Sequence, residues 1–300
     1  MLKRMSSIVC AIFCISMLVN SGYAEGLSVK DDNIYKISAF SPMFPDAYVE
    51  TSYDNVVSDQ VTAFSADSDR KLVGNLSATV YVEETYDNGV CTSSRLLSKE
   101  EVDSKIQLFS GTPGDTEEGS HYKLTMTFSV YEVNSSNAVD YELVATAHWN
   151  AGPLLNSGES RPSHGYDYMG FTWGGGHSMR DDEASGTANT GDPVEINIAD
   201  VSNREAIVWG FIEQLEDMPS PYLQWNYAKD LYATVRIYKK TSLTGEDCSA
   251  MFKYIHTYDD SVTSLSSVNI TNKGTTSVNF SLDTTTKQWP LILLFNQIHS

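Results

Sequence analysis

The feature that most constrains the fold of this chain is an alternation of apolar and polar residues with a period of two. In residues 124–130 the even positions are apolar, and in residues 143–149 the odd positions are apolar. This period places one face of a strand on a core and the other face in water. The turn-forming residues 134–137 lie between the two runs, so the pair is predicted to be an antiparallel hairpin.

The same pattern recurs along the rest of the chain. Shorter alternating stripes occupy residues 78–82, 194–198, 233–237 and 278–282. Residues 206–212 are apolar throughout, which predicts a central strand covered on both faces. The apolar run at 289–295 contains a proline and is too short to span a bilayer, so it is predicted to be a buried terminal strand.

Helix signals are few. Residues 98–101, Ser-Lys-Glu-Glu, resemble a capping box that leads into a short helix with Val102 and Ile106 on one face. Residues 213–217 are predicted to form one further helical turn. The sequence therefore predicts an all-β fold, an antiparallel β-sandwich that could be built as one unit or as two packed β modules.

The N-terminus has the organisation of a secretory signal peptide. A basic start at Lys3 and Arg4 is followed by about a dozen apolar residues and then by small residues that end at Ala24. We expect cleavage after Ala24 and a secreted, extracellular protein with no membrane insertion after cleavage. The mature chain, residues 25–300, is predicted to be a single β-rich domain, with a split near 150–163 as the alternative.

Two cysteines, Cys91 and Cys248, remain once the leader is removed. An exported chain meets an oxidising compartment, so we expect one disulfide between them. The bridge would close a very long loop, worth about 4–5 kcal/mol by loss of chain entropy in the unfolded state.

The chain is strongly acidic, with a formal net charge of −19 that becomes more negative when Lys3 and Arg4 leave with the leader. Such a charge repels phosphate backbones and anionic membrane surfaces, so nucleic acid is not an expected partner. The remaining expected partners are an extracellular glycan or a protein ligand. No cofactor is predicted.

Residues 163–187, SHGYDYMGFTWGGGHSMRDDEASGT, look most like a site. His148, His164, His177 and Asp181 supply imidazoles and a carboxylate that could bind zinc, although no HExxH spacing places two of them on one helical turn. The favoured interpretation is a long loop within residues 152–191, with the glycines at 174–176 as a turn. Zinc is accordingly not expected.

Calcium is the other ion considered, as a structural brace. Acidic residues cluster at 67–69, 181–183 and 259–260, on segments predicted to be loops. Calcium takes six to eight oxygen ligands, but no EF-hand spacing is present. Catalytic motifs are equally absent: there is no GxSxG elbow, and Glu213 with Glu216 is interpreted as a solvated pair rather than as glycosidase carboxylates.

Aromatic residues give the clearest candidate for binding. Trp225 and Tyr227 alternate along one segment, and Tyr232 and Tyr238 lie on the face opposite Ala233. Rings on the exposed side of a sheet can stack on sugars or contact another protein. The sequence therefore favours a non-catalytic binding or cell-surface interaction protein. A metal-dependent hydrolase that uses residues 148–183 and a structural assembly subunit are the alternatives.

Overall fold

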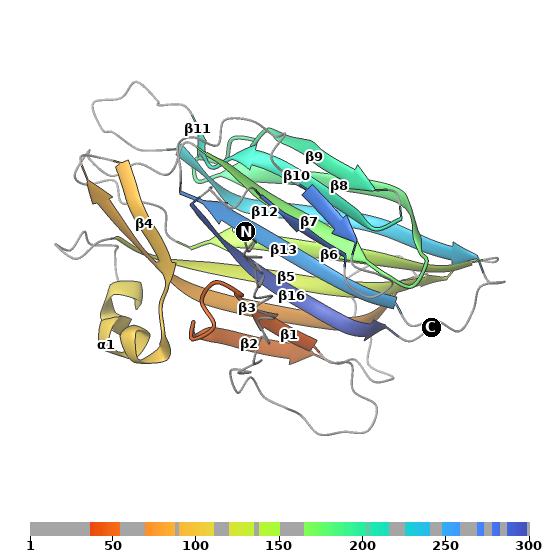
Figure 1. Ribbon diagram of the computed structural model, residues 1–300, viewed down its shortest axis with the longest axis horizontal. Helices are drawn as coiled ribbons and strands as arrows, with labels where there is room; N and C mark the ends of the chain where they lie inside the picture. Colours follow the sequence, from red (N-terminus) through yellow and green to blue (C-terminus); the bar gives the residue numbers. More distant parts are fainter. Residues whose placement is uncertain are drawn as a thin grey trace, which may run out of the picture.

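The computed structural model describes residues 37–54, 70–87, 90–110, 120–134, 138–150, 165–202, 204–215, 226–240, 248–258, 269–272, 278–282 and 287–298. The expected leader lies outside these ranges, as do His164 and Trp225. Strands make up most of the described residues, and two antiparallel sheets pack together as a β-sandwich (Figure 1). The predicted all-β fold is confirmed.

The first sheet, here called sheet A, has six strands. Their order across the sheet is β1 (Ile37–Phe40), β16 (Gln288–Ile298), β13 (Cys248–Thr257), β7 (Tyr166–Trp173), β10 (Ala206–Ile212) and β9 (Ile196–Ser202). Both terminal regions of the described chain thus lie in one sheet, where β1 pairs with β16.

The second sheet, here called sheet B, has eight strands. Their order is β11 (Gln214–Leu215), β12 (Asn226–Lys240), β6 (Ala138–Trp149), β5 (Ser120–Asn134), β3 (Arg70–Asp87) and β2 (Val49–Asp54), with β4 (Val90–Leu96) on β3 and β8 (Ser178–Ala188) on β12. The predicted hairpin of residues 124–149 is the β5–β6 pair. A separate two-stranded sheet joins β14 (Asn269–Asn272) to β15 (Val278–Ser281).

The core fills the space between the inner faces of the two sheets. Phe128 of sheet B contacts Phe171, Phe252 and Phe295 of sheet A, with ring centroids 5.0–6.4 Å apart. All four rings are at most 2 % exposed. The alternation seen in residues 124–130 therefore has the predicted cause, because the apolar residues at its even positions all lie in the core between the sheets.

A second apolar layer covers the outer face of sheet A. Phe280 of β15 packs there with Tyr168, Val208 and Ile255. The approach is close, because a Cβ atom on Gly170 of β7 would lie 3.1 Å from the Phe280 ring and 2.5 Å from the carbonyl oxygen of Ile207. Strand β10 is therefore covered on both faces, as its unbroken apolar sequence predicted.

The single helix among the described residues, α1 (Lys99–Ser110), begins with the predicted capping box. The Glu101 amide donates to Ser98 Oγ at 3.4 Å, and the Ser98 amide donates to Glu101 Oε2 at 2.9 Å. Val102 and Leu97 pack on Tyr81, so the start of the helix covers the outer face of sheet B. Within the described part of the chain, helical segments lack the length and apolarity needed to cross a bilayer.

The expected loop over residues 152–191 is wrong for residues 165–191, and residues 152–164 lie outside the described residues. Residues 165–191 contain β7, an inner strand of sheet A, and β8, an edge strand of sheet B, joined by a turn in which Gly175 and Gly176 have φ of 72°. Strand β7 is buried on both faces and so shows no alternation. Strand β8 is an edge rich in exposed charge, which protects it from pairing with other chains.

Two smaller expectations are also wrong. Residues 214–215 form strand β11, so no helical turn begins at Glu213. Cys91 and Cys248 are buried and no disulfide joins them, and each thiol lies on a nearby carbonyl: Cys91 Sγ donates to Ser93 and Cys248 Sγ to Gly174. The physical reason is placement, because β4 lies at the opposite end of the sandwich from the start of β13 (Figure 1).

Candidate functional site

The chemically richest part of the core is a polar cluster between the two sheets, formed by Glu84, Asp167, Glu213 and His256. Sheet A supplies Asp167 from β7 and His256 from β13, and Glu213 follows directly after β10. Sheet B supplies Glu84 from β3. All four side chains are buried, and His256 is only 1 % exposed.

The imidazole of His256 is the centre of this cluster. Its Nε2 lies 3.0 Å from Glu84 Oε1, and its Nδ1 lies 3.1 Å from Asp167 Oδ2. The same Nδ1 is 3.6 Å from Glu213 Oε2. Two carboxylates therefore converge on one ring nitrogen, while the third holds the other nitrogen.

The carboxylate of Asp167 is fixed by two further donors. Its Oδ1 accepts the backbone amide of Thr257 at 2.8 Å, and its Oδ2 accepts the Tyr254 hydroxyl at 2.5 Å. That hydroxyl in turn accepts the indole N–H of Trp149 at 3.2 Å, which ties the cluster to sheet B. Asp167 can therefore turn very little.

Aromatic rings surround the imidazole. The centroid of the Trp289 ring lies 5.0 Å from that of His256, the Trp149 ring 5.5 Å and the Tyr258 ring 6.4 Å. These apolar walls keep the local dielectric low and strengthen every charge interaction within the cluster. The backbone of Glu213 is fixed as well, because its carbonyl accepts the Ala228 amide at 2.8 Å.

Burial and mutual repulsion shift the titration of this cluster. Burial raises the pKa of Glu213 well above its usual range, and the nearby Asp167 and Glu84 carboxylates act in the same direction. Burial alone lowers the pKa of His256, but Asp167 and Glu213 raise it well above its ordinary value. Burial and the Asp167 charge raise the pKa of Tyr254. Three carboxylates thus share one imidazole, which leaves an excess of acid groups over basic ones.

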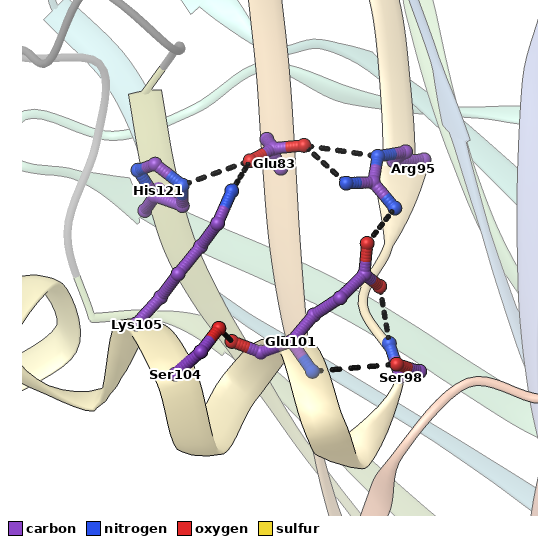
Figure 2. A network of polar contacts seen from close by, with 7 residues as sticks. All are labelled: Glu83, Arg95, Ser98, Glu101, Ser104, Lys105 and His121. Atoms are coloured by element: carbon purple, nitrogen blue, oxygen red, sulfur yellow. Dashed lines mark hydrogen bonds and ion pairs between the residues drawn. The ribbon is translucent and has the colours of Figure 1, made fainter.

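A second polar network lies on the outer face of sheet B, beneath α1 (Figure 2). Glu83 is its centre: Arg95 donates two hydrogen bonds to Oε2, and Lys105 and His121 reach Oε1. Arg95 also bonds Glu101 at 2.7 Å, which links the network to the capping box. Burial raises the pKa of Glu83, but the bonds from Lys105 and Arg95 outweigh it and lower that pKa. The charged groups of this network are paired with one another, which indicates a structural role for the network.

Two of the candidate zinc ligands from the sequence, His148 and Asp181, occupy separate places on sheet B. His148 Nδ1 pairs with Asp230 Oδ1 at 2.5 Å on the outer face of sheet B. Asp181 lies opposite Arg236 of β12. Arg236 is six residues further along β12 than Asp230, which is the partner of His148, and six residues of a strand span about 20 Å. His148 and Asp181 therefore do not share an ion.

His177 and the acidic residues 181–183 are not the exposed loop residues that the sequence suggested as ligands of an ion. The His177 ring is buried, with its Nδ1 3.2 Å from the Gly174 carbonyl oxygen, and burial lowers its pKa. Residues 181–183 belong to strand β8 and not to a loop. The acidic groups at 67–69 and 259–260, proposed as calcium ligands, lie outside the described residues.

The predicted aromatic surface is smaller than expected. Tyr227 is only 7 % exposed and belongs to the core. Tyr238 lies on the outer face of sheet B, but the Arg180 guanidinium covers its ring at 4.6 Å. Tyr232 is half-buried on the same outer face, as the alternation of β12 predicted.

Around Tyr232 the strand register builds a row of hydroxyl groups across sheet B, here called the hydroxyl row. One residue from each of six adjacent strands contributes: Ser185, Tyr232, Thr146, Thr127, Ser77 and Ser52. Thr127 and Thr146 are hydrogen-bonded through their hydroxyls at 2.7 Å. All six residues are half-buried or exposed.

Sequence reasoning missed both the His256 cluster and the hydroxyl row. Glu84, Asp167, Glu213 and His256 are far apart in the chain, and no local spacing relates them. One signal was present, because Glu84 and His256 each continue the inward-facing positions of an apolar strand. Polar residues at core positions are costly unless paired, so they mark a site even when the partners are unknown.

Comparison with known proteins adds little. No protein-family model matches the chain, and no curated protein matches it. One of the solved structures that the chain matches is described as a pore forming protein, with 6 % sequence identity over 76 % of this chain and 96 % of that one. The TM-score of 0.29 is too low for this likeness to bear on fold or function.

Proposed function

We propose that this protein is a secreted, non-catalytic β-sandwich that binds a neutral carbohydrate through the hydroxyl row on the outer face of sheet B. The observation that carries the proposal is the row itself: six adjacent strands each present one hydroxyl side chain at the same register. With strands about 4.8 Å apart, the row is about 24 Å long, comparable to several sugar units in line.

The chemistry of the row suits sugar hydroxyls. Serine, threonine and tyrosine hydroxyls each donate and accept, so they can pair with sugar groups in either sense. Tyr232 adds an aromatic ring next to Thr146, on which the apolar face of a sugar can stack. No charged side chain belongs to the row, and the net charge of −19 disfavours anionic polysaccharides.

The test is a glycan array probed with the purified protein, followed by calorimetric titration of the neutral oligosaccharide that it retains. Tyr232→Ala should weaken binding by about 2- to 10-fold, the worth of one aromatic contact. The isosteric pair Thr127→Val with Thr146→Val should weaken it further, because two donors are lost without a change of shape.

Tyr131→Ala is the matched control. Tyr131 is half-buried on the outer face of β5, four residues beyond Thr127 and outside the row. It should leave the affinity unchanged. The proposal is wrong if the array retains no neutral glycan, or if Tyr232→Ala and Tyr131→Ala bind equally well.

Assembly is the second candidate function, favoured by the exposed apolar residues of β9. Among the described strands β9 ends sheet A, and it exposes Ile198 by 52 % and Val201 by 45 %. An open edge with apolar side chains is a common route to pairing between subunits. Sedimentation of the purified protein as a dimer or larger, reversed by Val201→Lys, would favour this function over glycan binding.

A further inference from the structure

We propose that Asp167, Glu213 and His256 bind a divalent transition-metal ion, with zinc as the ion that fits best, and that Glu84 orients the imidazole. One ligand atom from each of the three residues lies within 4.8 Å of the other two, and all three residues are buried. Nothing in the proposed carbohydrate binding requires this ion, so the two proposals stand separately.

The distances between the donor atoms support the assignment. Ligands about 2.0–2.1 Å from a tetrahedral zinc ion lie about 3.3 Å from one another. His256 Nδ1 is 3.1 Å from Asp167 Oδ2 and 3.6 Å from Glu213 Oε2, on either side of that value. The longer distance exceeds a good hydrogen bond, and one N–H cannot point at both oxygens. An ion between the three atoms would satisfy all of them at once.

Two of the three ligands have the hydrogen-bond partners that are typical of a metal centre. A histidine that binds a metal through one nitrogen usually donates its other N–H to a carboxylate, which fixes the ring. His256 has this arrangement, with Nε2 3.0 Å from Glu84 Oε1. Asp167 is held in the same way by the Tyr254 hydroxyl and the Thr257 amide. Two of the three ligands, His256 and Asp167, are therefore aimed by their neighbours.

Charge also favours a cation. Three carboxylates surround one imidazole in a part of the core walled by Trp149 and Trp289, and buried charge is costly unless it is balanced. A divalent ion supplies positive charge at the point where the carboxylates meet. Zinc accepts mixed nitrogen and oxygen ligands, whereas calcium and magnesium prefer oxygen alone.

The experiment is metal titration of the purified protein after treatment with a chelator. The wild-type protein should retain one equivalent of zinc through desalting, measured by elemental analysis. Glu213→Gln and Asp167→Asn, which keep the shape of each side chain, should lose it. Glu84→Gln should weaken binding by about 10- to 100-fold, as expected when the group that orients a ligand is altered. His148→Gln, at the exposed histidine, is the control and should retain one equivalent.

A second measurement needs no variant, which matters if a substitution in the cluster prevents folding. Cobalt(II) bound in place of zinc should give one strongly shifted, exchangeable imidazole N–H resonance, because a single histidine coordinates and its Nε2–H is shielded by Glu84. The proposal is overturned if the wild-type protein retains no metal, if the folded ligand variants retain as much as the wild type, or if no such resonance appears.

Discussion

The buried amine of Lys253 should make the stability of this protein depend on pH in a direction unusual for a lysine. The side chain points to the outer face of sheet A and is 5 % exposed, and its Nζ donates to the Phe280 carbonyl at 2.6 Å. Burial lowers the pKa of Lys253 from 10.5 to about 8. At pH 7 the amine is therefore charged in an environment that disfavours the charge.

The size of the effect follows from linkage. Between pH 8 and pH 10.5 the unfolded chain binds more protons at Lys253 than the folded chain, so this residue makes stability rise with pH. Integrated from pH 7 to pH 10, with 1.36 kcal/mol for each unit of pKa, the gain is about 2.5 kcal/mol. Well below pH 8 Lys253 is protonated in both the folded and the unfolded state, and the folded protein bears the full free-energy cost of the buried charge.

Lys253→Met removes the titration and keeps a side chain of similar length. Urea unfolding at intervals from pH 7 to pH 10 would give the free energy of unfolding of both proteins. Relative to the wild type, the variant should be most stable at pH 7 and should lose about 2.5 kcal/mol of that advantage by pH 10. Lys71→Met, which removes an exposed charge, is the control. A constant difference between Lys253→Met and the wild type across this range would refute the reasoning.

Two other predictions concern the Glu83 network and the thiols of Cys91 and Cys248. Glu83→Gln should cost about 1–3 kcal/mol at pH 7, because Arg95, Lys105 and the buried His121 lose their carboxylate partner. Because the pKa of Glu83 is lowered in the folded protein, this deficit should shrink as the pH falls below the ordinary glutamate range and should close once the wild-type carboxylate is protonated in the folded state. Glu100→Gln, at an exposed glutamate, is the control in urea unfolding. Cys91 and Cys248 should resist a thiol reagent until the protein unfolds, and reductant should leave the thermal midpoint unchanged. A thermal midpoint that falls when reductant is added would instead indicate a disulfide between the two cysteines.

Local sequence signals predicted much of the architecture. The period-2 pattern of residues 124–149 predicted the β5–β6 hairpin and its buried face, and the motif at 98–101 predicted the start of α1. The unbroken apolar run at 206–212 predicted a strand covered on both faces. Each of these signals comes from residues a few positions apart, and their outcome depends on whether a side chain faces water or the core.

Segments without such a signal were misjudged. Strand β7 has both faces buried, so its apolar and polar residues do not alternate, and its sequence resembles that of a loop. The disulfide expectation rested on the compartment and the number of cysteines, neither of which carries information about distance in the fold. Strand β4, which carries Cys91, and the start of β13, where Cys248 lies, are at opposite ends of the sandwich (Figure 1), and no local pattern predicts this separation.

The sequence by itself determined that this chain forms antiparallel strands with one apolar face, and which residues of the alternating strands face inward. Only the tertiary structure decided which strands lie side by side. The physical reason is that alternation fixes the face of a residue but not its neighbour across the sheet. The hydroxyl row depends on the register of six strands, and the His256 cluster depends on two sheets packing so that Glu84 meets Asp167, Glu213 and His256.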